Sequence, residues 1–410
     1  MSKMSFFVGL LSLLLPLLIY ADETVADCKV SSYVDLVRCA EKRSSDIQIS
    51  EQQLKSAEKL ADVANQWINP DLDADTVAKG SDRSETNITL LFNLRLGGKK
   101  DALISEAQSE IERARANRDL GVHRSRLELM LGLYRLAHIK SEIHIEEESV
   151  ETFSKISQQY QKRPALSPEQ DVSLSVFKMA LADHQLRLTK LKSDEEKLYQ
   201  EIMAVTGLPK SLISKNLPLP KKAWTPLDGS STTDESPQVR AALADLKLAK
   251  SQRQKTESES WPDLKIGPSM KAVKENGEST TFVGLALSMP LPVFSQNGPS
   301  RTYSAQRLIE AEMIAEQTKR KATSTRSELV SRYNQTIQSL KSSLSLSIVN
   351  EKHEQLERQF FKGVVPSSLV IEAHRQLFDL EERRNASELE ALDAYGRVLI
   401  IDNKFNEVVL

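Results

Sequence analysis

Two segments of the chain alternate apolar and polar residues, and they differ from the long stretches around them. The first covers 71–96 and the second covers 263–293, where Asn276-Gly277 supplies a turn signal. Alternation with a period of two predicts a strand with one apolar and one polar face, and Asn-Gly favours the tight turn of a β-hairpin. The sequence therefore predicts two amphipathic hairpins.

The other stretches repeat apolar residues every three or four positions, which is typical of helices. We expect one helix over about 32–66 and a second over about 99–163. At about 1.5 Å per residue, the second helix would be about 95 Å long, too long for a compact domain. In the second half we expect a short helix from about Gln238 and a long, unbroken helix over about 300–361.

These elements occur twice in the same order: a helix, a hairpin, a long helix, a tight turn and a returning helix. Tyr160 and Phe360, which precede the two turns, are 200 residues apart. Residue identity between the halves is slight, so the shared order of elements carries the inference of a repeat. The predicted units are a first repeat at 22–206 with its turn at 163–168, a linker at 207–237, a second repeat at 238–405 with its turn at 362–367, and a tail at 406–410.

Composition and charge narrow the possible classes of protein. The chain has 57 acidic and 55 basic residues among 410, for a net charge of −2. This balance provides no basic surface for nucleic acid. Glycine and proline together make up about 7% of the chain, against about 12% in average proteins, which favours long helices. After the N-terminus no window has 18 uninterrupted apolar residues, which argues against a bundle of membrane-spanning helices.

The first 21 residues have the features of a secretory signal peptide. Lys3 gives a short basic region, 6–20 is apolar, and Ala21 is the small residue that a signal peptidase prefers. The alternative is an uncleaved anchor, although the apolar run is short for a hydrocarbon core of about 30 Å. Export would place Cys28 and Cys39, the only two cysteines, in an oxidising compartment, either as a local disulfide or as two unpaired thiols.

Four amphipathic strands in an exported protein lead to a geometric problem. Strands of about 9 to 13 residues match the length of a tilted membrane-spanning strand. In lipid the sheet must close into a barrel, and the smallest such barrels have about eight strands. Four strands cannot close alone, so several copies would have to share one barrel, and three copies would give about twelve strands. The alternative is that both hairpins are soluble ribbons packed on the helices.

The order of elements behind a signal peptide resembles that of the TolC family of outer-membrane efflux ducts. The strand exit at 288–297 is similar to the Pro-Leu-Pro-Leu-Phe-Asn run of the subgroup that serves cation pumps of the resistance-nodulation-division (RND) type, including the cobalt-zinc-cadmium pumps. The chain departs from the pattern in three ways. The first turn has Arg163-Pro164, whereas the second has Gly363-Val364. Ser295 replaces an Asn of the subgroup, and the lipid-bearing cysteine of some members is absent. The other matching motifs are Asn69-Pro70-Asp71-Leu72, Trp261-Pro262-Asp263-Leu264 and Phe361-Lys362-Gly363-Val364-Val365-Pro366-Ser367-Ser368-Leu369.

The resemblance implies a mainly α protein with a transmembrane β-barrel. Four strands per protomer would contribute to a twelve-stranded barrel in a homotrimer, in the outer membrane of a Gram-negative bacterium, and the antiparallel coiled-coil helices would form an α-barrel in the periplasm. The linker at 207–237 would form an equatorial belt. Such a duct passively conducts heavy-metal cations or other small molecules from a periplasmic adaptor (membrane fusion) protein and an inner-membrane RND-type pump to the exterior. Its partners would be these two proteins and outer-membrane lipid, without nucleic acid and without a cofactor.

The resemblance also assigns roles to residues near the two turns, which would form the periplasmic tip. By counting from Gly363, the family's acidic entrance position falls on Glu372, and the alternative is a solvated glutamate on a helix face. Apolar tip residues would dock the adaptor, unless they only pack helix ends. Asp171 and Glu169 are further entrance candidates by their position after the first turn alone, and a latch could form if basic tip residues pair with these carboxylates. The latch residues are Lys162, Arg163, Lys362 and Arg375, and the docking residues are Leu166, Gly363, Val364, Val365, Ser367 and Leu369.

The sequence gives no support for catalysis or for a metal site. No nucleophile elbow, zinc-protease motif, CxxC or phosphate-binding loop is present. We expect none of the histidines to combine with an acidic or sulfur ligand three or four residues away. An enzyme is therefore the least supported class, and the alternative to a duct is a periplasmic coiled-coil adaptor or structural protein without a membrane barrel. The six histidines are His123, His138, His144, His184, His353 and His374.

Overall fold

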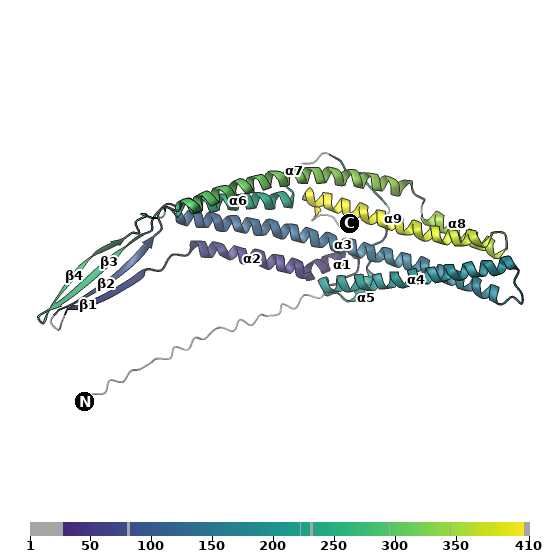
Figure 1. Cartoon of the computed structure of the whole chain (residues 1–410), viewed down its shortest axis with the longest axis horizontal. Coiled ribbons are helices and arrows are strands. Elements are labelled where there is room, and N and C mark those ends of the chain that lie inside the picture. The colour runs from purple at the N-terminus through teal and green to yellow at the C-terminus, as the bar shows by residue number, and fades with distance from the viewer. Residues whose placement is uncertain are drawn as a thin grey trace, which may run out of the picture.

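The protein is a long rod of helices with a four-stranded sheet at one end, as seen in a computed structural model (Figure 1). The structure describes residues 28–79, 83–221, 223–229, 233–294, 296–344 and 346–405. The expected signal peptide, the centre of the first hairpin turn, Ser295 and the tail at 406–410 lie outside the described residues. Among the described helices, none has both the length and the apolar content to cross a bilayer.

The two repeats contain the elements that the sequence predicts, in the predicted order. The helix at residues 99–161 is central, since helices from both halves of the chain pack against it. The first repeat consists of α1 (Tyr33–Arg43), α2 (Ser45–Asn65), β1 (Asp71–Lys79), β2 (Arg83–Leu94), α3 (Lys99–Gln161) and α4 (Pro168–Thr206). The second consists of α6 (Pro237–Ser258), β3 (Leu264–Glu275), β4 (Glu278–Ser288), α7 (Gly298–Ser342), α8 (Leu346–Phe361) and α9 (Ser367–Ile401).

Local sequence signals set many helix ends. The Ser32 side chain accepts a hydrogen bond from the backbone N–H of Asp35 and caps α1. Ser167 and Gln170 form a capping box at the start of α4, with Pro168 as the first helical residue. Gly207 ends α4 with a positive φ of 63°, a conformation that costs glycine little.

The prediction of an unbroken helix over 300–361 is wrong, because the chain leaves the helical conformation at Ser343. The Ser342 and Ser343 hydroxyls donate hydrogen bonds to the backbone carbonyls of Ser339 and Leu340. Serine side chains that bind nearby carbonyls compete with the helical backbone bonds. The rod therefore has a joint between α7 and α8.

Two further boundaries differ from the prediction. The expected helix over 32–66 is divided into α1 and α2 at Ser44, which has a non-helical ψ of 120°. The Ser44 side chain is buried and its hydroxyl lies 3.4 Å from that of Ser125 on α3. The linker at 207–237 is not entirely irregular, since it contains the short helix α5 (Lys210–Lys215).

The two hairpins form one antiparallel sheet with the strand order β1-β2-β3-β4. Strands β2 and β3 join the repeats, in a register that runs from Arg83 opposite Glu275 to Leu94 opposite Leu264. The backbone approaches closely at Gly267, where a Cβ atom would lie 1.8 Å from the Leu90 carbonyl oxygen. A side chain at this position would therefore force the two central strands apart.

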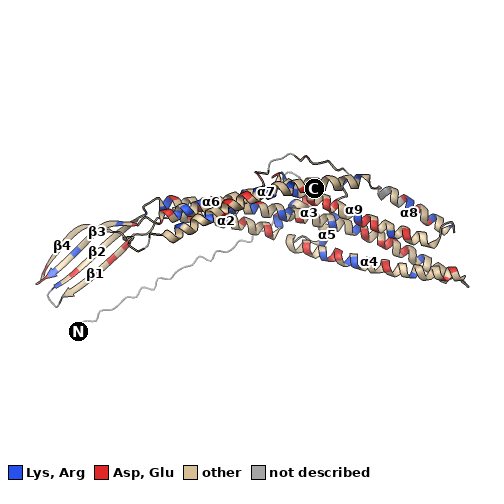
Figure 2. Ribbon diagram, turned by 45° about the horizontal axis from the view of Figure 1, so that its top comes forward, with Lys and Arg blue, Asp and Glu red and all other residues tan. Residues whose placement is uncertain are grey.

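The helices pack around a series of apolar clusters from the middle of the rod to the end opposite the sheet. In the middle, residues such as Leu36, Met130 and Tyr199 are fully buried between α1, α3 and α4. Near the far end, Phe153 and Phe177 form a smaller cluster with Ile156 and Val370. Burying one such side chain contributes about 1.5–3 kcal/mol. Acidic and basic residues are interspersed along the helices (Figure 2).

Candidate functional site

The sheet has one apolar and one charged face, as the alternation predicts. On the charged face, the Lys265 ammonium lies 2.7 Å from the Asp71 carboxylate and the Lys271 ammonium lies 2.6 Å from the Glu85 carboxylate. On the apolar face, Leu285 on β4 is 82% exposed. An exposed apolar face of this extent is unusual for a soluble surface and indicates contact with a membrane or a partner. The exposed apolar residues of this face are Leu72, Ile88, Phe92, Leu94, Ile266, Met270, Val283, Leu285 and Leu287.

The outer edges of the sheet belong to β1 and β4. Within the described residues, β1 pairs only with β2 and β4 only with β3. Both edges therefore present unpaired backbone donors and acceptors, which favour pairing with another strand. Because all neighbours in this order are antiparallel, β1 and β4 run in opposite directions.

Exposed aromatic residues surround the junction between the sheet and the helices. Trp67 precedes β1 and is 76% exposed, with the Lys100 ammonium 4.5 Å from the centre of its ring. Trp261 precedes β3 and is also exposed. Gly97 allows the chain to pass Trp261, because a Cβ atom there would lie 2.4 Å from its ring. The junction thus has an exposed tryptophan shortly before the first strand of each hairpin.

The other end of the rod, which we call the tip, consists of the turn at 162–167 between α3 and α4 and the turn at 362–366 between α8 and α9. The two turns lie beside one another, because Phe177 of α4 contacts Tyr160 before the first turn and Phe360 before the second, with ring centres 6.0 and 5.8 Å apart. A groove of about 570 Å³ lies between them. The structure therefore brings the two predicted turns together.

The predicted docking residues differ in exposure. Val364 and Leu369 are exposed, whereas Leu166, Val365 and Ser367 are half-buried. Val365 packs against the Phe153 cluster. Gly363 has a φ of 75°, which requires glycine or a strained residue, and it lets the chain reverse before α9. Val364 and Leu369 are the predicted docking residues that offer most apolar surface to a partner.

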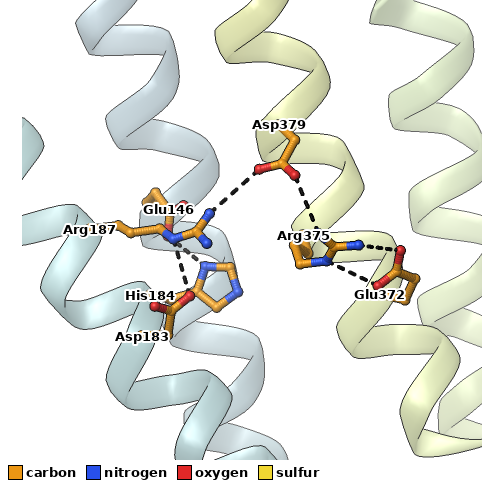
Figure 3. Close-up of polar contacts among 7 residues, drawn as sticks. All are labelled: Glu146, Asp183, His184, Arg187, Glu372, Arg375 and Asp379. Carbon is orange, nitrogen blue, oxygen red and sulfur yellow. Dashed lines mark hydrogen bonds and ion pairs between the residues drawn. The ribbon is translucent and has the colours of Figure 1, made fainter.

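Glu372, the predicted entrance residue, is half-buried on α9, with 42% of its side chain exposed, and it pairs with Arg375 one turn later (Figure 3). The Glu372 carboxylate accepts two hydrogen bonds from the Arg375 guanidinium, at 2.7 and 3.0 Å, and one from Gln376. These bonds hold the pKa of the Glu372 carboxyl below its usual range. Glu372 is therefore ionised, but its charge is partly balanced within its own helix.

Arg375 also belongs to a chain of ion pairs between α9 and α4 (Figure 3). Its guanidinium lies 3.7 Å from the Asp379 carboxylate, which lies 3.7 Å from Arg187 on α4. Arg187 in turn pairs with Asp183 at 3.1 Å. Beside this chain, the buried Glu146 and His184 are hydrogen-bonded at 2.6 Å. The network joins helices of the two repeats near the tip.

The structure does not bring the other predicted latch and entrance residues into ion pairs. Among the described residues, Lys162, Lys362, Glu169 and Asp171 make none with each other or with Glu372. Arg163 instead lies over the Tyr160 ring at 4.7 Å. Glu169 and Asp171 lie in the first turn of α4, where negative charge stabilises the helix N-terminus. Among the described residues of one chain, Arg375 is therefore the predicted latch residue that pairs with a predicted entrance residue, Glu372.

The expectation about the histidines is wrong. His353 and Glu357 are four residues apart on α8, and His374 on α9 brings a third potential metal ligand to the same place. The i,i+4 spacing on one helix was the sequence signal for the first two residues, whereas the position of His374 depends on how α8 and α9 pack. Burial, together with the His374 ring, lowers the pKa of His353.

The linker and the N-terminal arm are attached to the middle of the rod. The Tyr333 hydroxyl donates to the Thr225 carbonyl, and the Arg326 guanidinium donates to the Gly229 carbonyl and to the Asp402 carboxylate. A disulfide joins Cys28 to Cys39 of α1, with the Cα atoms 5.7 Å apart. Both segments thus lie against helices near the middle of the rod.

Comparison with known proteins finds outer membrane channels among the structures with a similar fold. No protein-family model matches it. The nickel-cobalt-cadmium resistance protein NccC of Alcaligenes xylosoxydans xylosoxydans is 24% identical over 339 residues, which are 77% of this chain and 73% of NccC. The structure is similar to the Campylobacter jejuni CmeC outer membrane channel, with a TM-score of 0.72 and 12% identity over 91% of this chain and 86% of CmeC. It is similar to the open state of the Neisseria gonorrhoeae MtrE outer membrane channel, with a TM-score of 0.72 and 13% identity over 91% of this chain and 89% of MtrE.

Proposed function

We propose, since the chain has the fold of the TolC-family outer-membrane channels, that it is the exit duct of a tripartite efflux system. The duct conducts its substrate passively from the periplasmic tip to the exterior. The observation that carries this proposal is the amphipathic, open-edged sheet at one end of a helical rod. In a soluble adaptor or structural protein such a sheet would be unfavourable, because the apolar face of the sheet would lie in water.

Three copies of the chain close the sheet into one barrel. Because β1 and β4 run in opposite directions, β4 of one copy pairs with β1 of the next in the same antiparallel sense. Three copies then give about twelve strands and leave no edge, which satisfies every backbone group in lipid. The face with Leu285 lies against lipid, and the face with Asp71 and Lys265 lines the lumen.

The two tryptophans fit the periplasmic boundary of this barrel. Trp67 and Trp261 precede β1 and β3, where the sheet meets the helices. Tryptophan is enriched at both membrane–water interfaces, because its ring combines an apolar body with a polar N–H. In this arrangement the sheet spans the outer membrane and the helices extend into the periplasm.

The substrate class and the partners follow from the relatives and from the tip. NccC is named for resistance to nickel, cobalt and cadmium. By analogy, the proposed substrates of this chain are divalent metal cations, and the chain is assigned to the heavy-metal subgroup. The tip docks a periplasmic adaptor through Val364 and Leu369, and the adaptor connects it to an inner-membrane RND-type pump. Glu372 from three copies surrounds the entrance and attracts cations.

Fractionation of cells that express the full chain tests the location and the assembly. We expect the protein in the outer-membrane fraction, as a trimer that migrates as such in SDS gels unless it is heated. Metal sensitivity of a deletion strain, with and without the gene restored, tests the substrate class. Recovery as a soluble monomer would contradict the duct, and unchanged metal tolerance would contradict only the substrate.

A further inference from the structure

His353, Glu357 and His374 form a compact group of possible metal ligands near the tip. One nitrogen from each histidine and one oxygen from Glu357 all lie within 4.8 Å of one another. His374 Nε2 lies 3.0 Å from Glu357 Oε1. Two ligands at 2.0–2.1 Å from a tetrahedral zinc ion are about 3.3 Å apart. Small side-chain rotations therefore bring these three atoms into a coordination sphere.

His353 contributes an unexplained polar atom to this group. Its Nε2 atom is buried and has no hydrogen-bond partner among the described residues. The His353 ring lies against the His374 ring, with the ring centres 4.3 Å apart and the planes nearly perpendicular. A buried polar atom without a partner carries a desolvation penalty of about 1–3 kcal/mol. A bound ion would satisfy this nitrogen.

Residues of α3 orient two of the three ligands. The Thr152 hydroxyl donates to Glu357 Oε1 at 3.1 Å. Ser149 Oγ lies 2.9 Å from His374 Nδ1 and 3.0 Å from the Ile145 carbonyl oxygen. The Ser149 hydroxyl has one proton for these two partners. When it donates to Ile145, it accepts from His374 Nδ1–H, which leaves the lone pair of Nε2 free for a metal. Such outer partners commonly fix the tautomer of a metal-binding histidine.

The buried surroundings of His374 favour a bound metal ion over a solvated ion pair between His374 and Glu357. His374 is fully buried, and its ring lies 4.8 Å from that of Phe153. The neighbouring His184 is already paired with Glu146. Two imidazoles and one carboxylate suit divalent ions such as zinc, nickel and cobalt, whereas magnesium and calcium prefer oxygen ligands alone.

We propose that His353, Glu357 and His374 bind one divalent transition-metal ion of the zinc, nickel and cobalt class. The fourth position is left to water or to another ligand, as in sites with three protein ligands. The ion connects α8 to α9 one to three turns from the turn at 362–366, so it stabilises the helical hairpin of the tip. Binding is a property of the chain itself and does not depend on transport through a duct.

Metal titration of the full chain tests the site. The protein is purified in detergent through an affinity tag without histidine, stripped with a chelator, and titrated with Zn²⁺ by calorimetry and with Co²⁺ by visible absorption. We expect one ion per chain and the d–d absorption of Co²⁺ with nitrogen and oxygen ligands. His353→Ala and Glu357→Gln should weaken binding by more than the roughly 10–100-fold that loss of an outer partner causes. Ser149→Ala should weaken it within that range.

The chain provides a matched control in His144 and Glu148. They have the same i,i+4 spacing on α3, with His144 Nε2 3.4 Å from the Glu148 carboxylate, and both are exposed. His144→Ala should leave affinity and the Co²⁺ spectrum unchanged. Absence of saturable binding to the native chain would overturn the proposal. Native affinity in both His353→Ala and Glu357→Gln would also overturn it. Circular dichroism confirms that each variant is folded, and neither ligand variant alters the fully buried His374.

Discussion

At the scale of single residues, replacing Glu372 and replacing Arg375 should change the ion selectivity in opposite directions. Arg375 partly neutralises the Glu372 carboxylate. Glu372→Gln should therefore lower the cation selectivity of the duct, and Arg375→Gln should raise it. Reversal potentials in planar bilayers with a salt gradient measure both. Because hydrogen bonds hold the Glu372 pKa below the usual 4.5, the native selectivity should persist as the pH falls to 4.5.

Glu382 is the control for this pair. It is exposed on α9, further from the turn at 362–366, and its replacement by Gln changes the charge by the same amount. If Glu382→Gln shifts the reversal potential as much as Glu372→Gln does, total charge rather than the entrance sets selectivity. Equal potentials in all variants would remove Glu372 from the entrance.

The two faces of β4 also differ at the level of single residues. Leu285→Arg places a charge on the face assigned to lipid, which costs about 2–4 kcal/mol near the middle of a bilayer. Phe282→Arg changes the opposite face of the same strand, and the lumen proposed for that face would tolerate a charge. We expect Leu285→Arg to reduce the heat-modifiable trimer in the outer membrane and Phe282→Arg to leave it in place. Equal effects would contradict the assignment of the faces.

Single positions near the tip were predictable only where local spacing sufficed. Glu372 could be located by counting from Gly363, and its pairing with Arg375 spans one helical turn. The link from Asp379 to Arg187 could not be predicted, because it depends on the packing of α9 against α4. The grouping of His353 with His374 required the geometry of α8 and α9 for the same reason.

At the scale of elements, the disulfide makes a prediction about the N-terminal arm. Cys28 and Cys39 are 11 residues apart, and closing a short loop typically stabilises a protein by about 2–4 kcal/mol. Cys28→Ser should lower the midpoint of urea unfolding, and a reductant should lower the native midpoint to the same value. The reductant should not affect Cys28→Ser itself. A native midpoint that does not respond to the reductant would contradict a stabilising disulfide.

Helix and strand boundaries were predictable wherever a local signal marks them. Gly97-Gly98 before α3 and the capping box of Ser167 and Gln170 are such signals. The joint at Ser343 was missed because apolar spacing continues across it, while the serine hydroxyls take the carbonyls that the helix needs. The break at Ser44 lacks a proline or glycine and coincides with a tertiary contact to Ser125.

At the scale of the whole molecule, the pairing of the hairpins was beyond local reasoning. Alternation identifies each hairpin, but β2 pairs with β3 across a separation that includes two long helices and the linker. The same limitation applies to the proposed contact between copies, because the alternation within a strand is the same whether or not another chain pairs with its free edge. Barrel closure therefore needs a direct test.

Cysteine pairs across the proposed β4–β1 contact provide that test. Ala74 on β1 and Thr281, Val283 and Leu285 on β4 lie on the same face of the sheet, whereas Ala286 lies on the other. Disulfides form only when the Cβ atoms are about 3.5–4.5 Å apart, so Ala74→Cys should cross-link with one of the first three positions and not with Ala286→Cys. Since β1 and β4 are not neighbours within one chain, any cross-link must join two copies, and a closed ring gives a covalent trimer in non-reducing gels. Monomers in every same-face pair would show that the edges do not meet, and the sheet would then have to find another partner in the membrane.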